Sequence, residues 1–201
     1  MNQLNVAWFG WLAAGSNPSA WALALAKWLA HSGSIGLVLV LLALWWRSPK
    51  ERLYLAGVVL VCCLANVLAH MLAAQLAFPR PFVLGLSPVY VAHAARGALP
   101  SAHGSVVWAA AFCLLLQATL RRSPVNRALL ALFVLGAIWV CWARIYLGLH
   151  FPLDMVAGMA LGLLLAVAYR TVWAGLRRLV LRNLVQMWLL LRSARRSAVV
   201  R

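Results

Sequence analysis

Long apolar runs separated by short polar segments make up most of the chain. A membrane helix needs roughly 20 apolar residues to cross about 30 Å of hydrocarbon. Five stretches reach or approach that length, at residues 19–46, 53–76, 104–120, 127–143 and 153–173. The third and fourth are short, so we expect their helices to extend a few residues into the flanks. The pattern predicts an all-α membrane bundle of about five transmembrane helices.

The two ends of the chain are expected to form helices that lie at the membrane surface. Residues 2–14 are too short to span a bilayer, and their aromatic side chains suit the membrane interface. From Arg177 onward, leucines alternate with arginines, which is typical of an amphipathic helix against anionic lipid. We therefore predict one integral membrane domain, residues 1–176, and a basic amphipathic cytoplasmic tail, residues 177–201.

The composition favours a membrane protein and excludes other classes. The 201 residues are 66% hydrophobic and only 10% charged, yet the net charge is +16. A soluble domain carries about 25% charged residues, and a disordered chain needs low hydrophobicity. A nucleic-acid-binding domain would not separate its basic residues by such long apolar runs, so no nucleic-acid partner is expected.

The positive charges predict the orientation in the membrane, because loops rich in Lys and Arg stay in the cytoplasm. Fourteen of the 18 Lys and Arg residues fall on one side if the N-terminus lies outside. The C-terminus is then cytoplasmic. Two loops, about 77–103 and 144–152, face outward and hold most of the polar side chains that could carry chemistry.

The second outer loop combines a histidine with a nearby carboxylate. Pro152 suits the first position of a helix, so Asp154 falls in its first turn and can reach back to His150. Such a contact would hold the imidazole in one tautomer and stabilise its cation. Arg144, near the end of the preceding span, supplies a planar fork for phosphate oxygens.

The first outer loop offers an anion-binding helix start. Ser101 is expected to begin the third span, where unpaired backbone N–H groups favour an anion and the hydroxyl adds a donor. His103 lies in the first turn and can donate a proton, while Gly104 lets the backbone approach a ligand. Arg80 lies on a stiff segment between two prolines.

These side chains together predict an anion site with a nucleophile and an acid at one membrane face. Phosphoryl transfer fits best, because its charge spreads over three oxygens and calls for positioned cations and donors. Histidine can be the covalent nucleophile. One carboxylate is too few to hold Mg²⁺, so no metal or other cofactor is expected. His93 and Arg96 stay open between interfacial positions and rim contacts to a second phosphate.

Three motifs carry a resemblance to a known family. Arg80-Pro81, the sequence PSAH at 100–103, and R-x5-H-x3-D from Arg144 to Asp154 resemble the signature of the type 2 phosphatidic acid phosphatase (PAP2) superfamily. The chain is similar in particular to bacterial undecaprenyl pyrophosphate phosphatases of the bacitracin-resistance type, over most of residues 1–173. The resemblance implies a helical bundle of the PAP2/haloperoxidase type.

The same resemblance implies a role for each site residue. His150 would attack the terminal phosphorus and become a phosphohistidine, with Asp154 orienting it. His103 would protonate the leaving lipid phosphate and then activate water. The phosphoryl oxygens would be held by Arg80, Ser101, Gly104 and Arg144.

The sequence departs from the family pattern at three positions. The family usually has Lys where Ala73 stands, Ser in place of Ala143, and Gly or Asp in place of Ala102. The expected phosphate site thus has one cation and one hydroxyl fewer. Lys27 is predicted to replace the cation, since it lies about 10 Å below the outer end of the first span and its stem can carry the ammonium upward.

The resemblance implies an enzyme of the bacterial inner membrane, surrounded by membrane lipids, that releases phosphate from undecaprenyl pyrophosphate on the outer face. One alternative is a phosphatase for another lipid phosphate, such as phosphatidylglycerophosphate, phosphatidic acid or lipid A. Another is a non-catalytic relative that binds or transports lipid. The oligomeric state stays open.

Overall fold

The computed structural model describes the backbone of residues 3–199 and the side chains of residues 3–188. Within that part the chain is all-helical and contains no strand, as predicted. Two 3₁₀ turns, η1 (Pro49–Glu51) and η2 (Leu120–Arg122), connect helices at one end of the bundle. The α-helices are α1 (Gln3–Leu12), α2 (Ala20–Arg47), α3 (Arg52–Leu76), α4 (Ala102–Leu116), α5 (Pro124–Tyr146) and α6 (Pro152–Val199).

The protein is a multi-pass membrane protein. Helices α2, α3, α5 and α6 are long and apolar enough to cross a bilayer. Their outward side chains support this: Leu60 on α3 is 71% exposed and Leu164 on α6 is 69% exposed. Large apolar side chains so exposed are covered by lipid in a membrane, where a soluble protein would have to bury them.

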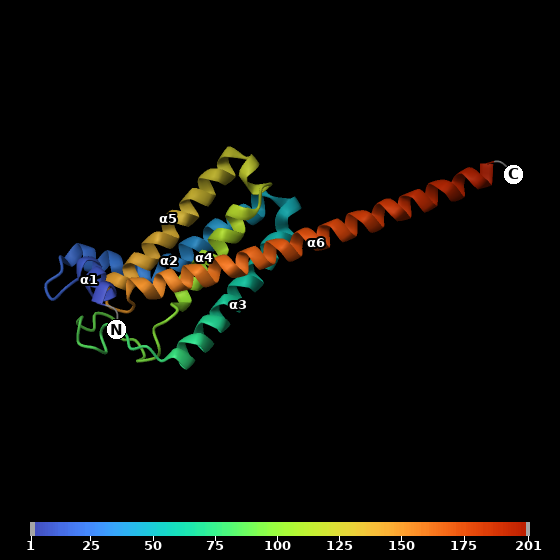
Figure 1. The fold of residues 1–201 in the computed structure, drawn as a ribbon. Helices are drawn as coiled ribbons and strands as arrows, with labels where there is room; N and C mark the ends of the chain where they lie inside the picture. The colour runs from blue at the N-terminus through green and yellow to red at the C-terminus, as the bar shows by residue number, and fades with distance from the viewer. Residues whose placement is uncertain (1–2, 200–201) are drawn as a thin grey trace.

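Helix α4 is the short, central element of the bundle (Figure 1). It spans 15 residues, roughly 22 Å, and packs against α3, α5 and α6. The sequence predicted that this helix would run to residue 120, whereas it ends at Leu116. Gln117 leaves the helix, and its side-chain amide donates to the carboxylate of Glu51 beside η1. The polar contact turns the chain before the predicted end.

Helix α6 passes very close to α4 because it presents glycines to it. A Cβ atom at Gly158 would lie 2.9 Å from both the Ser101 carbonyl oxygen and the Ser105 nitrogen, and one at Gly162 would lie 2.6 Å from the Ala109 nitrogen. Small residues allow helix backbones to approach in this way in membrane proteins. The contact brings the start of α4 against the start of α6.

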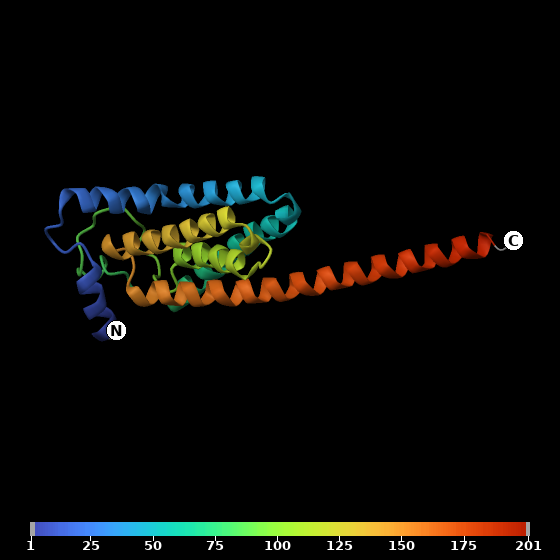
Figure 2. The ribbon, with the colours of Figure 1, turned by 90° about the horizontal axis from the view of Figure 1, so that it is seen from above.

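The ends of the chain agree with the prediction in part. Helix α1 forms as expected, and Phe9 packs edge-on against Phe151 with ring centroids 5.3 Å apart. Residues 177–199, predicted as a separate surface helix, instead continue α6 straight beyond the bundle (Figure 2). After Gly175 this segment holds no glycine or proline that would break a helix, so the helix runs on. The division at residue 176 and the surface location of the tail stay predictions.

The close contact between α4 and α6 can be tested at Gly158. We expect Gly158→Ala to lower the free energy of unfolding by about 1–3 kcal/mol, because the added methyl meets backbone atoms that cannot move aside. The matched control is Gly36→Ala, where no atom lies within 4 Å of the added carbon, so stability should hold or rise. Thermal unfolding in detergent measures both; equal stability of the two variants would contradict the contact.

Candidate active site

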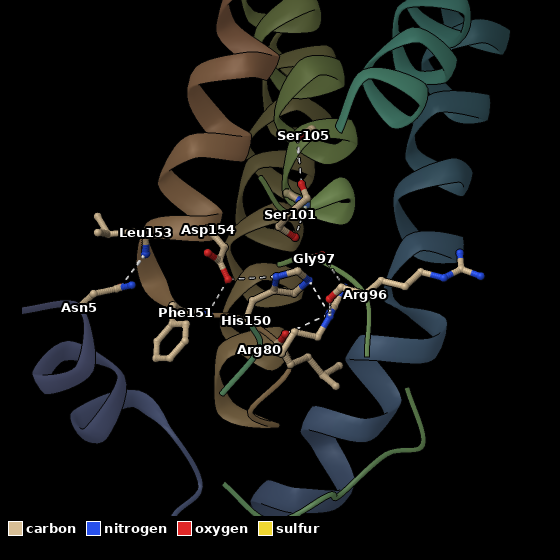
Figure 3. A network of polar contacts seen from close by, with 12 residues as sticks. Asn5, Arg80, Arg96, Gly97, Ser101, Ser105, His150, Phe151, Leu153 and Asp154 are labelled. Carbon is tan, nitrogen blue, oxygen red and sulfur yellow. Dashed lines mark hydrogen bonds and ion pairs between the residues drawn. The ribbon is translucent and has the colours of Figure 1, made fainter. Parts of the chain in front are cut away.

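Four helix ends meet at the site. Helices α3 and α5 end there, α4 and α6 begin there, and the two predicted outer loops cross the same end of the bundle (Figure 3). Gly148 reverses the chain after α5 with a φ of +71°, a conformation that glycine adopts readily. The Phe82 N–H donates to the Gly148 carbonyl at 3.3 Å, which joins the two loops.

Asp154 binds two groups with one carboxylate oxygen. Its Oδ2 accepts the backbone N–H of Phe151 at 2.8 Å and lies 3.3 Å from Nδ1 of His150. The first contact caps α6, because it satisfies one of the unpaired N–H groups at the helix start. The second places the Nδ1 proton toward Asp154 and leaves Nε2 with its lone pair. His150 is 3% exposed and therefore held in one orientation.

Arg80 lies on the Nε2 side of His150. Its Nη1 is 3.1 Å from His150 Nε2 and donates to the Leu149 carbonyl at 3.0 Å. Its Nε donates to the Arg96 carbonyl at 3.0 Å, and its Nη2 to the Gly97 carbonyl at 3.4 Å. An arginine has no acceptor, so the contact with Nε2 requires the lone pair that the Asp154 contact predicts. A fixed positive charge thus stands beside the candidate nucleophile.

His103 and Arg144 form the second polar pair of the site. His103 lies in the first turn of α4, and its Nε2 is hydrogen-bonded to Nη2 of Arg144 at the end of α5. Arg144 is 6% exposed, and its Nε has no hydrogen-bond partner in the described part of the chain. A buried guanidinium with an unused donor suits an anionic ligand.

Ser101 caps α4 and ties it to α6. Its Oγ accepts the Gly104 N–H at 3.3 Å, and its own backbone N–H donates to the Asp154 carbonyl at 3.0 Å. Gly104 therefore serves the helix cap, and a Cβ there would lie 3.2 Å from the sulfur of Met155 on α6. The structure explains this glycine by packing, and its implied contact with phosphate stays a prediction.

Burial controls the protonation of His150. Removal from solvent lowers its pKa to about 4, and the cations of Arg80 and Arg144 add to this effect, while the bond to Asp154 opposes it. Burial likewise lowers the pKa of Arg80, against the opposing charge of Asp154. A lowered pKa favours the neutral imidazole above about pH 4, so His150 is a free base near neutral pH.

Lys27 is the predicted site residue that the structure does not bring into this network. It is exposed on α2, and the described part of the chain holds no hydrogen bond or ion pair to it. Its predicted role as a replacement cation stays a prediction. The other seven predicted residues lie in three connected groups: Asp154 with His150 and Arg80, His103 with Arg144, and Ser101 with Gly104.

Asn5 is a contributor that sequence reasoning missed. Its Oδ1 accepts the Leu153 N–H at 3.1 Å and so caps a second unpaired group at the start of α6 (Figure 3). An asparagine within the otherwise apolar residues 4–12 is the signal that could have marked it, and the structure buries it to 8% exposure. Nothing in the sequence pairs residue 5 with residue 153, however.

The comparison with protein families agrees with the motifs. The PAP2 superfamily model matches residues 54–178. The chain belongs to the PAP2 superfamily. It is therefore a membrane phosphatase of the PAP2 type, and the resemblance inferred from the three motifs is confirmed.

Relatives of named activity cover much of the chain. The Escherichia coli protein named "Putative undecaprenyl-diphosphatase YbjG" is 24% identical over 94% of this chain and 91% of its own length. Undecaprenyl-diphosphatase BcrC of Bacillus subtilis is 25% identical, over 67% of this chain and 66% of its own length. A lipid A 1-phosphatase of Rhizobium etli is 30% identical, over 80% of this chain and 70% of its own length.

Two solved structures share the fold. The PAP2-type phosphatidylglycerolphosphate phosphatase of Bacillus subtilis superposes with a TM-score of 0.64 at 18% identity, over 86% of this chain and 85% of that one. Aquifex aeolicus LpxE gives a TM-score of 0.64 at 22% identity, over 84% and 95%. The predicted PAP2-type helical bundle is thereby confirmed.

The double role of Asp154 predicts that two substitutions differ. Asp154→Asn keeps an oxygen for the Phe151 N–H but can no longer hold the imidazole as an anion does, so kcat should fall by orders of magnitude while stability changes little. Asp154→Ala also removes the cap and should lower the free energy of unfolding by a further amount of about 0.5–2 kcal/mol. Phosphate release and thermal unfolding measure the two effects. An Asn variant with normal kcat would contradict the orienting role.

Proposed function

We propose that this PAP2 phosphatase hydrolyses undecaprenyl pyrophosphate to undecaprenyl phosphate and inorganic phosphate. The orientation of His150 is the main support for this proposal: its Nδ1 faces Asp154 and its Nε2 faces Arg80. An oriented, neutral imidazole beside a fixed cation is suited to attack an anionic phosphorus. The relatives named as undecaprenyl-diphosphatases support this substrate.

The first chemical step transfers the terminal phosphoryl group to the enzyme. Nε2 of His150 bonds to the terminal phosphorus, and the bond from that phosphorus to the bridging oxygen breaks. The bound phosphate takes up the Arg144 donor and its negative charge favours the protonated form of His103. His103 then gives this proton to the departing undecaprenyl phosphate. Arg80 and Arg144 stabilise the charge on the three phosphoryl oxygens, where phosphoryl transfer needs positioned cations.

The second step returns His150 to its resting state. His103, now neutral, takes a proton from a water molecule as that water attacks the phosphohistidine. The bond between phosphorus and Nε2 breaks, and inorganic phosphate leaves. Asp154 keeps its bond to Nδ1 in both steps and stabilises the positive charge that the imidazole acquires.

The substrate chain can enter from the membrane beside His103. A cavity of about 360 Å³ lies between α2, α3 and α4, and its lining is apolar except for a few polar side chains. Val59 and Cys62 of α3 and Val106 of α4 line it, with His103 also part of the lining. The cavity takes a part of a polyprenyl tail, while the rest of so long a tail stays in lipid.

The charges at the other end of the bundle support the orientation that we propose for the protein in a bacterial inner membrane. Arg47, Lys50 and Arg122 gather around η1 and the loop before α5, away from the site. The positive-inside rule favours a cytoplasmic location for this end, and with it a site at the outer face, an N-terminus outside and a C-terminus inside.

A lipid A phosphatase is the second candidate. The Rhizobium etli relative of that name has a higher identity to this chain, 30%, than the relatives named as undecaprenyl-diphosphatases. The phosphate-binding residues would be the same for both substrates, so the two functions differ only in which lipid the cavity beside His103 accepts.

The proposal predicts phosphate release by the purified protein in detergent. A panel of polyprenyl diphosphate, phosphatidylglycerophosphate, phosphatidic acid and lipid A should show the highest kcat/KM for polyprenyl diphosphate. His150→Ala should lower kcat/KM at least about 10³-fold, since it removes the proposed nucleophile. His31→Ala is the matched control, because His31 is exposed on α2 away from the network. Preference for lipid A would favour the second candidate, and equal rates for His150→Ala and wild type would refute catalysis by this site.

A further inference from the structure

A second cavity adjoins the site on the far side of Arg80. It has a volume of about 520 Å³ and lies between the end of α3 and the loop before α4. His70 and Ala73 line it from α3, and Arg80, His93 and Arg96 line it from the loop. Water occupies about 30 Å³ per molecule in the liquid, so the cavity has room for a phosphate group with its hydration.

The cavity is lined by cationic or neutral groups without a carboxylate. The chain has two acids: Glu51 is bound by Gln117 at the cytoplasmic end, and Asp154 is bound by His150 and Phe151. Alanines along α3 leave the space open. The guanidinium groups of Arg80 and Arg96 line an open space without a carboxylate in its lining, and such a space attracts an anion.

The charges of the site converge on this space. Burial lowers the pKa of His93, and the cations of Arg80, Arg144 and Arg96 each lower it further, so all three lie near the same imidazole. The Arg96 side chain is exposed and extends away from His150, past Arg80 (Figure 3). It is therefore placed for a group that lies farther from Nε2 than the attacked phosphorus.

Arg80 connects the cavity with the nucleophile. One of its guanidinium nitrogens is 3.1 Å from His150 Nε2, and the residue also lines the cavity. Along α3, Asn66 lines the apolar cavity beside His103, and His70, one helical turn further, lines the cationic one. A lipid with its tail in the apolar cavity would thus present its headgroup to the cationic cavity and to Arg80.

We propose that this cavity is a second phosphate subsite, which holds the lipid-bearing phosphate of a diphosphate while His150 attacks the terminal one. Arg96, with His93 and His70, then determines the preference for lipid diphosphates over lipid monophosphates. The inference rests on the proposed function. When the bond to the bridging oxygen breaks, the lipid monophosphate gains negative charge, and these groups stabilise it where it forms.

The test compares two substrates with one tail, farnesyl diphosphate and farnesyl monophosphate. Arg96→Gln and His93→Gln should lower kcat/KM for the diphosphate about ten- to a hundredfold, mainly through KM, as loss of a bond to a charged group does. The effect on the monophosphate should be at least tenfold smaller. Arg96→Gln keeps the backbone carbonyl that holds Arg80.

The controls separate charge and fold from binding. Arg121→Gln removes the same charge at the cytoplasmic end, and His31→Gln removes an exposed histidine from α2; both should leave the diphosphate rate unchanged. Inhibition supplies a second measurement: Arg96→Gln should raise the Ki of inorganic pyrophosphate at least fivefold more than that of orthophosphate.

The outcomes distinguish this inference from the proposed function. Suppose that wild type hydrolyses the diphosphate, but Arg96→Gln lowers kcat/KM equally for both substrates or for neither. The second subsite is then refuted and the proposed function stands. If wild type releases no phosphate from the diphosphate, the proposed function and the subsite are both refuted.

Discussion

The site depends on one carboxylate, that of Asp154, which both stabilises the start of a helix and orients the histidine beside it. Asp154 Oδ2 caps the first turn of α6 through the Phe151 N–H and orients His150 through Nδ1. The position of the proposed nucleophile is therefore fixed by the same carboxylate that caps the helix. Because His150 is buried, its ring is already oriented before substrate binds, so little conformational entropy is lost in the reaction.

Helix packing carries this arrangement to the other half of the site. Glycines let α6 lie against α4, and the Ser101 N–H then reaches the Asp154 carbonyl. The pair of His103 and Arg144 lies on α4 and α5, which pack against each other. In a membrane, association between helices relies on close packing and hydrogen bonds, so these backbone contacts decide the distance between His103 and His150.

The spans and the contact between His150 and Asp154 could be predicted from the sequence because both are local signals. Apolar runs locate α2, α3, α5 and the first half of α6, and the pairing of His150 with Asp154 follows from their spacing around Pro152. Contacts between distant segments could not be predicted. The pairing of Asn5 with Leu153 and the backbone carbonyls that hold Arg80 depend on loop paths that carry no periodic pattern.

The same limit explains the two differences in the helices. The end of α4 depends on the contact of Gln117 with Glu51, which are far apart in the sequence. The tail was predicted to form a separate helix from its amphipathic pattern, but an amphipathic pattern states which face is polar and not where a helix bends. A cavity such as the one between His70 and Arg96 likewise appears only once the loop is placed.

The central step that we propose is the covalent phosphorylation of His150 at Nε2. The most direct measurement is acid-labile, alkali-stable radiolabel on the protein after mixing with polyprenyl diphosphate labelled at the terminal phosphorus. We expect a brief burst of label in wild type, persistent label in His103→Gln, where water is no longer activated, and none in His150→Ala. Label on His150→Ala would contradict phosphorylation of His150. So would phosphate release without labelled protein in both wild type and His103→Gln.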